Sequence, residues 1–128
     1  MGKVLFIALG GAIGTACRYY LSGLDYRFSN GIFPFSTFLI NLLGSLVIGF
    51  LWGFCERTVV APQVRMFVFI GILGGFTTFS TLSLETFNLL RDGEIRIAFW
   101  NIFLTNTIGV ALVFAGYALS KLPVLLTK

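Results

Sequence analysis

Apolar residues fill four long stretches of the chain, and short polar segments separate one stretch from the next. A helix needs about 20 consecutive, mainly apolar residues to cross the hydrocarbon of a bilayer. We therefore predict membrane-spanning helices near residues 4–24, 34–55, 65–90 and 97–120. The connections are too short for a further domain. Residues 1–128 are thus expected to form a single transmembrane domain of the all-α class.

The composition favours lipid over water as the solvent of this chain. Hydrophobic residues make up 57% and charged residues only 11%, whereas soluble domains carry about a quarter charged residues. The chain also contains 15 glycines, which weaken helices in water but let helices approach closely in a membrane. We therefore expect a multi-pass membrane protein.

Several other classes of protein are disfavoured. A cleaved signal peptide is one interpretation of the first stretch, but a single lysine precedes it, glycines interrupt it and Arg18 follows it directly. The chain has no histidine, and Cys17 and Cys55 stand far apart, so a transition-metal site is not expected. No nucleophile–base pair is recognisable, so we predict that the chain is not an enzyme. No nucleic-acid partner is expected.

The basic residues divide almost evenly between the two sides of the membrane. The side that holds both termini would carry Lys3, Arg57, Arg65, Lys121 and Lys128. The other side would carry Arg27, Arg91 and Arg96, joined by Arg18 if its side chain reaches that way. A fixed orientation normally shows a clear cytoplasmic excess of lysine and arginine. Two interpretations stay open: one slightly biased orientation, or insertion both ways round, which permits an antiparallel dimer.

Small residues recur at helical spacing in three of the predicted spans. The stripes are Gly10 and Gly14, then Ser45, Gly49 and Gly53, and finally Ala111 and Ala115. Such stripes let helix backbones touch in lipid. They are usable within one subunit or between subunits, and their presence on three spans favours a homo-oligomer.

The third span contains the strongest local signal. Gly74 and Gly75 are followed by a threonine- and serine-rich segment at 77–81, and both features disfavour a continuous helix. We predict a break in mid-membrane, where freed carbonyls suit a small cation such as Na⁺. If a helix restarts near Ser80, then Thr81, Glu85 and Asn88 share one face and form a polar track. Phe79 beside the track offers either plain packing or a positive ring edge to an anion.

Polar groups in the other spans also indicate function, because they are costly in lipid. Arg18 either reaches the membrane surface or lines a vestibule that attracts anions. Asn41 either joins two helices or donates to a passing anion. In the fourth span, Asn101 and Thr105 share a face, while Asn106 is expected to point elsewhere.

Three motifs together resemble one known family. They are Gly10-Gly11-x-x-Gly14-x-x-x-Arg18-Tyr19, Thr37-x-x-x-Asn41-x-x-Gly44, and Gly74-Gly75-Phe76-Thr77-Thr78-Phe79-Ser80-Thr81 followed by Glu85. In this order, within four predicted spans, they resemble a subunit of the Fluc (CrcB) fluoride channels over essentially the whole chain.

The resemblance implies a fluoride-selective channel in the bacterial inner (plasma) membrane. It implies an antiparallel, dual-topology homodimer with two fluoride pores and a structural Na⁺ at its centre. The main-chain carbonyls of Gly74 and Thr77 would hold the Na⁺, and Arg18 would stand in a vestibule. The residues that map to the pore are Asn41, Phe79, Ser80, Thr81 and Glu85. One departure is Leu82, which stands where the family usually has a second phenylalanine.

The chemistry of these residues suits fluoride. Neutral donors such as the Asn41 amide and the hydroxyls of Ser80 and Thr81 can replace water around a small anion without trapping it. One alternative is a dual-topology, proton-coupled exporter, which needs an acid in its central cavity and usually carries it in the first span, where this chain has Arg18. Another is a scaffold subunit without transport, in which the polar residues would only join helices.

Overall fold

The computed structural model describes residues 2–23 and 32–125, and all regular structure in these residues is helical. The helices are α1 (Gly2–Ser22), α3 (Phe35–Cys55), α4 (Pro62–Arg65), η1 (Met66–Leu73), α5 (Gly74–Phe76), α6 (Phe79–Arg91) and α7 (Ile95–Leu125). Four candidate spans, at Gly2–Ser22, Phe35–Cys55, Pro62–Arg91 and Ile95–Leu122, are long and apolar enough to cross a membrane. Each of them overlaps one of the spans predicted from the sequence.

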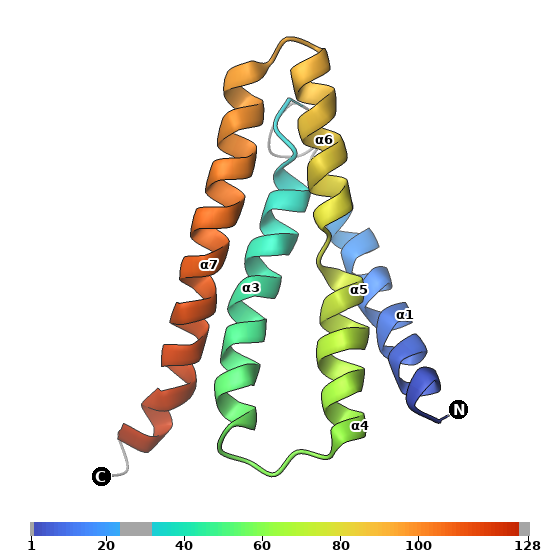
Figure 1. Ribbon diagram of the computed structural model, residues 1–128, viewed down its shortest axis with the longest axis vertical. Helices are drawn as coiled ribbons and strands as arrows, with labels where there is room; N and C mark the ends of the chain where they lie inside the picture. The colour runs from blue at the N-terminus through green and yellow to red at the C-terminus, as the bar shows by residue number, and fades with distance from the viewer. Residues whose placement is uncertain (1, 24–31, 126–128) are drawn as a thin grey trace.

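The helices form two side-by-side pairs (Figure 1). Helix α3 lies along α7, and α1 lies along η1 and α5. The two ends of the described chain and the segment 56–61 lie at one end of the bundle, and the turn at 92–94 lies at the other. Helix α3 begins directly after Pro34, which cannot donate a backbone hydrogen bond.

Glycines bring the helices of each pair into backbone contact. A Cβ added at Gly14 would overlap the Ile72 carbonyl of η1, and one added at Gly49 would overlap the Val113 carbonyl of α7. Two of the three small-residue stripes therefore pack within the chain, and they give no support to a homo-oligomer. The third differs, because Ala111 and Ala115 are exposed on the surface of the single chain.

The third span is interrupted, as the sequence predicted. It starts as the short helix α4, widens into the π-helix η1 and returns to α-helical geometry in α5. Thr77 and Thr78 are then extended, with φ and ψ of −78° and 156° and of −152° and 118°. Helix α6 restarts at Phe79, one residue before the predicted position near Ser80. The break lies well inside the candidate span Pro62–Arg91.

Candidate functional site

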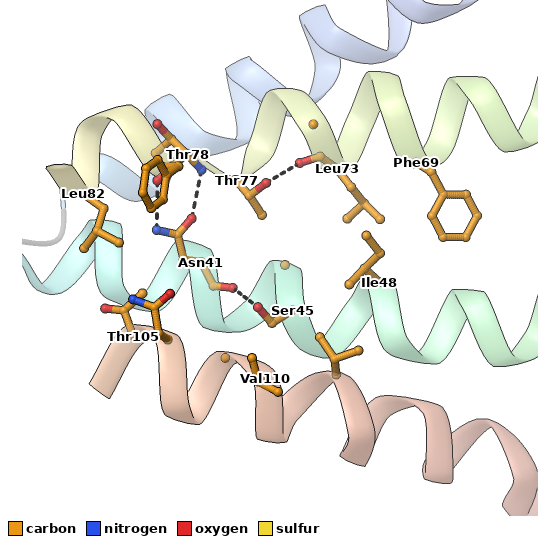
Figure 2. Close-up of a pocket in the computed structure, with 16 residues that line it drawn as sticks. Asn41, Ser45, Ile48, Phe69, Leu73, Thr77, Thr78, Leu82, Thr105 and Val110 are labelled. Atoms are coloured by element: carbon orange, nitrogen blue, oxygen red, sulfur yellow. Dashed lines mark hydrogen bonds between the residues drawn. The ribbon is translucent and has the colours of Figure 1, made fainter. Parts of the chain in front are cut away.

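The Asn41 side chain of α3 bonds the backbone at the break. Its Nδ2 donates to the Thr78 carbonyl over 3.0 Å, and its Oδ1 accepts from the Thr78 N–H over 2.9 Å (Figure 2). Of the two roles predicted for this residue, joining two helices is therefore present in the structure. An amide suits this position because it offers a donor and an acceptor side by side.

Two N–H groups that a continuous helix would use internally bond to side chains instead. The Thr78 N–H, which would donate to the Gly74 carbonyl, donates to Asn41. The Thr81 N–H, which would donate to the Thr77 carbonyl, donates over 3.2 Å to the Thr78 hydroxyl, the N-cap of α6. The carbonyls that lose their helical donors are thus those of Gly74 and Thr77, the predicted Na⁺ ligands.

A cavity of about 380 Å³ lies beside the break, between α3, α7 and the third span. Its lining includes Asn41, Gly74, Thr77, Phe79 and Thr105 (Figure 2). None of the described residues that line it is charged. The cavity thus combines a mainly apolar lining, which includes the rings of Phe69 and Phe79, with neutral hydrogen-bonding groups.

Phe79 and Leu82 contribute to this cavity in different ways. The Phe79 side chain is 76% exposed in the single chain, whereas Leu82 is only 4% exposed and belongs to the core. Both lie on the same side of α6, because they are three positions apart on the helix. Leu82 therefore occupies a packed position at the edge of the cavity, and Phe79 an open one.

Glu85 lies apart from the first cavity. Its Oε1 accepts a hydrogen bond of 2.6 Å from the buried Thr37 hydroxyl of α3. With Asn88, Asp92 and Glu94 it lines a second cavity of about 430 Å³ near the turn at 92–94. Two members of the predicted polar track, Glu85 and Asn88, therefore share a cavity, whereas the third, Thr81, does not line it.

Ser80 and Thr81 lie in the first turn of α6, between Phe79 and Glu85 in the sequence and close to the break. The Thr78 hydroxyl is 3.0 Å from the Thr81 hydroxyl and 3.4 Å from that of Ser80. Neither Ser80 nor Thr81 is among the residues that line either cavity. Arg18 is half-buried on α1 and is also absent from both linings. The predicted site residues thus fall into four groups rather than one: those at the first cavity, Ser80 with Thr81, Glu85 at the second cavity, and Arg18 on α1.

The polar residues of α7 are arranged differently from the prediction in one respect. Asn101 and Thr105 do share an inward face and are 0% and 6% exposed. The Asn101 Nδ2 donates over 3.1 Å to the Thr86 hydroxyl of α6. Asn106, expected to point elsewhere, lines the first cavity together with Thr105. Two adjacent positions can border one cavity because it is wide enough to span two faces of the helix.

Sequence reasoning gave no separate role to Thr37 or Thr78, although both stand in the motifs. Thr37 holds Glu85, and Thr78 holds Asn41 and caps α6. The spacing of Thr37 and Asn41 was an available signal, because residues four apart on a helix face the same neighbour. Both side chains of α3 do bond to the third span.

Comparison with known proteins identifies the family. A family model described as "CrcB-like protein, Camphor Resistance (CrcB)" matches residues 5–117 of the 128-residue chain. The chain belongs to the CrcB family. CrcB membership confirms the resemblance that the motifs of the first three spans predicted.

Relatives of this CrcB protein match it over most of its length. A protein from Geotalea daltonii is 44% identical over 122 residues, which are 94% of this chain and 98% of the relative. One from Methylobacillus flagellatus is 44% identical over 124 residues, 95% of this chain and 97% of the relative. Both are named fluoride-specific ion channel FluC. Together with its four candidate spans, membership of CrcB makes this chain a multi-pass membrane protein.

Proposed function

We propose that this chain is a subunit of a channel that conducts fluoride passively across a membrane. The observation that carries the proposal is the interrupted third span, beside which apolar side chains, Phe79 among them, and uncharged polar groups line a cavity. Relatives of equal length are named fluoride-specific channels. A channel is in keeping with the expectation that the chain is not an enzyme.

The proposed pathway runs from the first cavity, past the break, to the second cavity. Asn41 and Phe79 stand at its start, Ser80 and Thr81 along it, and Glu85 at its far end. Nδ2 of Asn41 has a second N–H besides the one that bonds Thr78, and the hydroxyls are further donors. Weak, repeated donors allow an anion to enter and to leave, whereas a fixed positive charge in a narrow path would bind it too tightly for release.

Fluoride efflux from proteoliposomes tests the function directly. We expect rapid release of fluoride, little release of chloride, and no requirement for a proton gradient. A proton-coupled exporter would need the gradient, and it would need an acid in the central cavity, where none of the described lining residues is acidic. Absence of any flux would support the scaffold alternative and refute the proposal.

We propose further that two copies assemble around a structural Na⁺. The carbonyls of Gly74 and Thr77 have lost their helical donors to side chains, and carbonyls of unwound helices are typical Na⁺ ligands. Two carbonyls are too few to surround the ion. Gly74 is exposed in the single chain, and an added Cβ would meet only the Phe69 carbonyl at 3.8 Å. A second copy related by a two-fold axis would supply the same two carbonyls again.

The proposed dimer is antiparallel and lies in the bacterial inner membrane. The near-even count of lysine and arginine on the two sides supports insertion in both orientations. Replacing Na⁺ by a large organic cation on both sides of the vesicles should abolish fluoride flux, and restoring Na⁺ should recover it. Full flux after exhaustive removal of Na⁺ would refute the structural ion but would leave the fluoride pathway standing.

A further inference from the structure

An apolar groove of about 450 Å³ lies between α3 and α7, at the end of the bundle that carries the two ends of the described chain. The α3 wall is Ile48, Gly49 and Trp52, and the α7 wall is Val113, Phe114 and Tyr117. Phe114 is 72% exposed and Trp52 is 49% exposed in the single chain. The groove is therefore open to the surroundings of the helices.

One carboxylate holds the two aromatic side chains at the mouth of this groove. Trp52 Nε1 donates to Glu56 Oε1 over 3.1 Å, and the Tyr117 hydroxyl donates to Glu56 Oε2 over 2.8 Å. The candidate spans end at Cys55 and Leu122, close to both rings in sequence. Tryptophan and tyrosine at such positions lie at the level of the lipid headgroups. The groove therefore extends from headgroup level toward the bilayer interior.

Two cations lie on these rings. The Arg65 guanidinium carbon is 5.4 Å from the centroid of the Trp52 ring, and Lys121 Nζ is 4.0 Å from that of Tyr117. Neither forms an ion pair with any residue that the structure describes. Arg57 lies at the same end, where it donates to the Ser120 carbonyl. Three cations against the single acid Glu56 leave this mouth positively charged.

We propose that the groove binds an anionic phospholipid of the surrounding membrane. One acyl chain would lie between Trp52 and Phe114, and the phosphate would lie between Arg65 and Lys121. An aromatic belt alone would place rings at the interface. Here the two rings lie at the mouth of an apolar groove, and the cation on each ring forms no ion pair within residues 2–23 and 32–125. Each basic residue at headgroup level strengthens the binding of anionic lipid by a factor of about five.

The two tryptophans of the chain allow a site-specific test. Trp100→Phe leaves Trp52 in the groove as the only reporter, and Trp52→Phe leaves Trp100, which lies on α7 outside the groove lining. The full-length protein is placed in phosphatidylcholine vesicles that contain a minor fraction of brominated phosphatidylglycerol or, separately, of brominated phosphatidylcholine. Bromine quenches tryptophan only at close range. The ratio of quenching by the two lipids reports their relative occupancy.

We expect brominated phosphatidylglycerol to be at least fivefold enriched at Trp52 and not enriched at Trp100. Arg65→Gln with Lys121→Gln should remove the enrichment, and Lys3→Gln with Arg96→Gln, two exposed cations elsewhere, should preserve it. Lys121→Glu, a change at one exposed position, should reduce the ratio to one or below. Equal quenching by both lipids at Trp52 would overturn the proposal. Quenching by neither would also overturn it, because a second copy of the chain would then cover the groove.

Discussion

At the residue scale, Asn41 supplies both hydrogen bonds that the extended backbone at Thr78 requires. A backbone N–H and C=O without partners in a membrane cost several kcal/mol each, because lipid offers none. The two bonds, of 2.9 and 3.0 Å, remove this cost on one side of the break. The same amide thus stabilises the interrupted span and presents its remaining N–H beside the cavity.

Replacing Asn41 with Asp should abolish fluoride flux and also lower thermal stability. The carboxylate places a negative charge at the cavity, and it cannot donate to the Thr78 carbonyl, which loses its partner at a cost of about 1–3 kcal/mol. Efflux and thermal unfolding in detergent measure the two effects. Asn106→Asp is the matched control, because Asn106 lines the same cavity but its amide donates to the Ile102 carbonyl of its own helix rather than to the break. Equal loss of stability in both variants would contradict the role in the break.

Phe79→Ile should reduce fluoride flux severely and leave thermal stability within about 0.5 kcal/mol of the parent protein. Phe79 is 76% exposed in the single chain, so its removal opens no core cavity, but it takes the ring away from the proposed path. Phe87→Ile is the control, since Phe87 lies on the same helix and is 58% exposed but does not line the cavity. Normal efflux from the Phe79 variant would show that the ring only packs.

Leu82→Phe tests the position at which this chain departs from the family. The ring can enter the adjoining cavity of about 380 Å³, so we expect fluoride flux to stay at or above the parent rate. If the ring instead stays where leucine is 4% exposed, overpacking costs about 1–3 kcal/mol, and flux and stability should fall together. Efflux and thermal unfolding distinguish these outcomes. Lost flux at unchanged stability would contradict both explanations.

At the scale of elements, the break was predictable because its causes are local. Adjacent glycines and a run of hydroxyl side chains weaken a helix wherever they stand. The partners across the bundle were not predictable. Asn41 and Thr78 are 37 residues apart, and Thr37 and Glu85 are 48 apart. The spacing of Thr37 and Asn41 indicates that they face the same neighbour, but nothing local to either residue specifies which residue of that neighbour it bonds.

Which helices pair with each other was equally unpredictable from the sequence, since each span is apolar on most of its surface. In lipid, apolar residues favour no particular neighbour, so the periodicity that orients helices in water gives little information. The glycine stripes located the close contacts, but they did not tell whether the partner helix belonged to the same chain. The structure places Gly14 against η1 and Gly49 against α7 within one chain.

Gly44→Ala should weaken the contact between α3 and the break. An added Cβ would overlap Cγ2 of Thr77, and the Thr77 hydroxyl is fixed by a 2.9 Å bond to the Leu73 carbonyl. We expect a loss of about 1–3 kcal/mol in stability, measured by thermal unfolding, and reduced fluoride efflux. Gly11→Ala is the control, because a Cβ there meets nothing within 4 Å. Unchanged stability in the Gly44 variant would show that the break can shift away from α3.

At the scale of the whole molecule, the break in the third span and the cavity beside it lie at the surface of the single chain. Phe79 and Gly74, on the two sides of the break, lie on the surface of the single chain. In the proposed dimer these surfaces meet their counterparts. The orientation of the two copies is then the property that determines whether the carbonyls of both breaks can meet at one Na⁺ in mid-membrane.

Labelling of single cysteines should show both orientations in nearly equal amounts. In a variant with Cys17→Ala and Cys55→Ala, Val59→Cys places a thiol at a fully exposed position between α3 and α4, and Glu94→Cys places one at the opposite end of the bundle. Since lysine and arginine differ little between the two sides, a membrane-impermeant maleimide added to intact cells should label about half of each variant. Permeabilised cells, in which both sides are accessible, give the reference for full labelling. A single orientation would instead label one variant almost completely and the other hardly at all, and the antiparallel dimer would then be wrong.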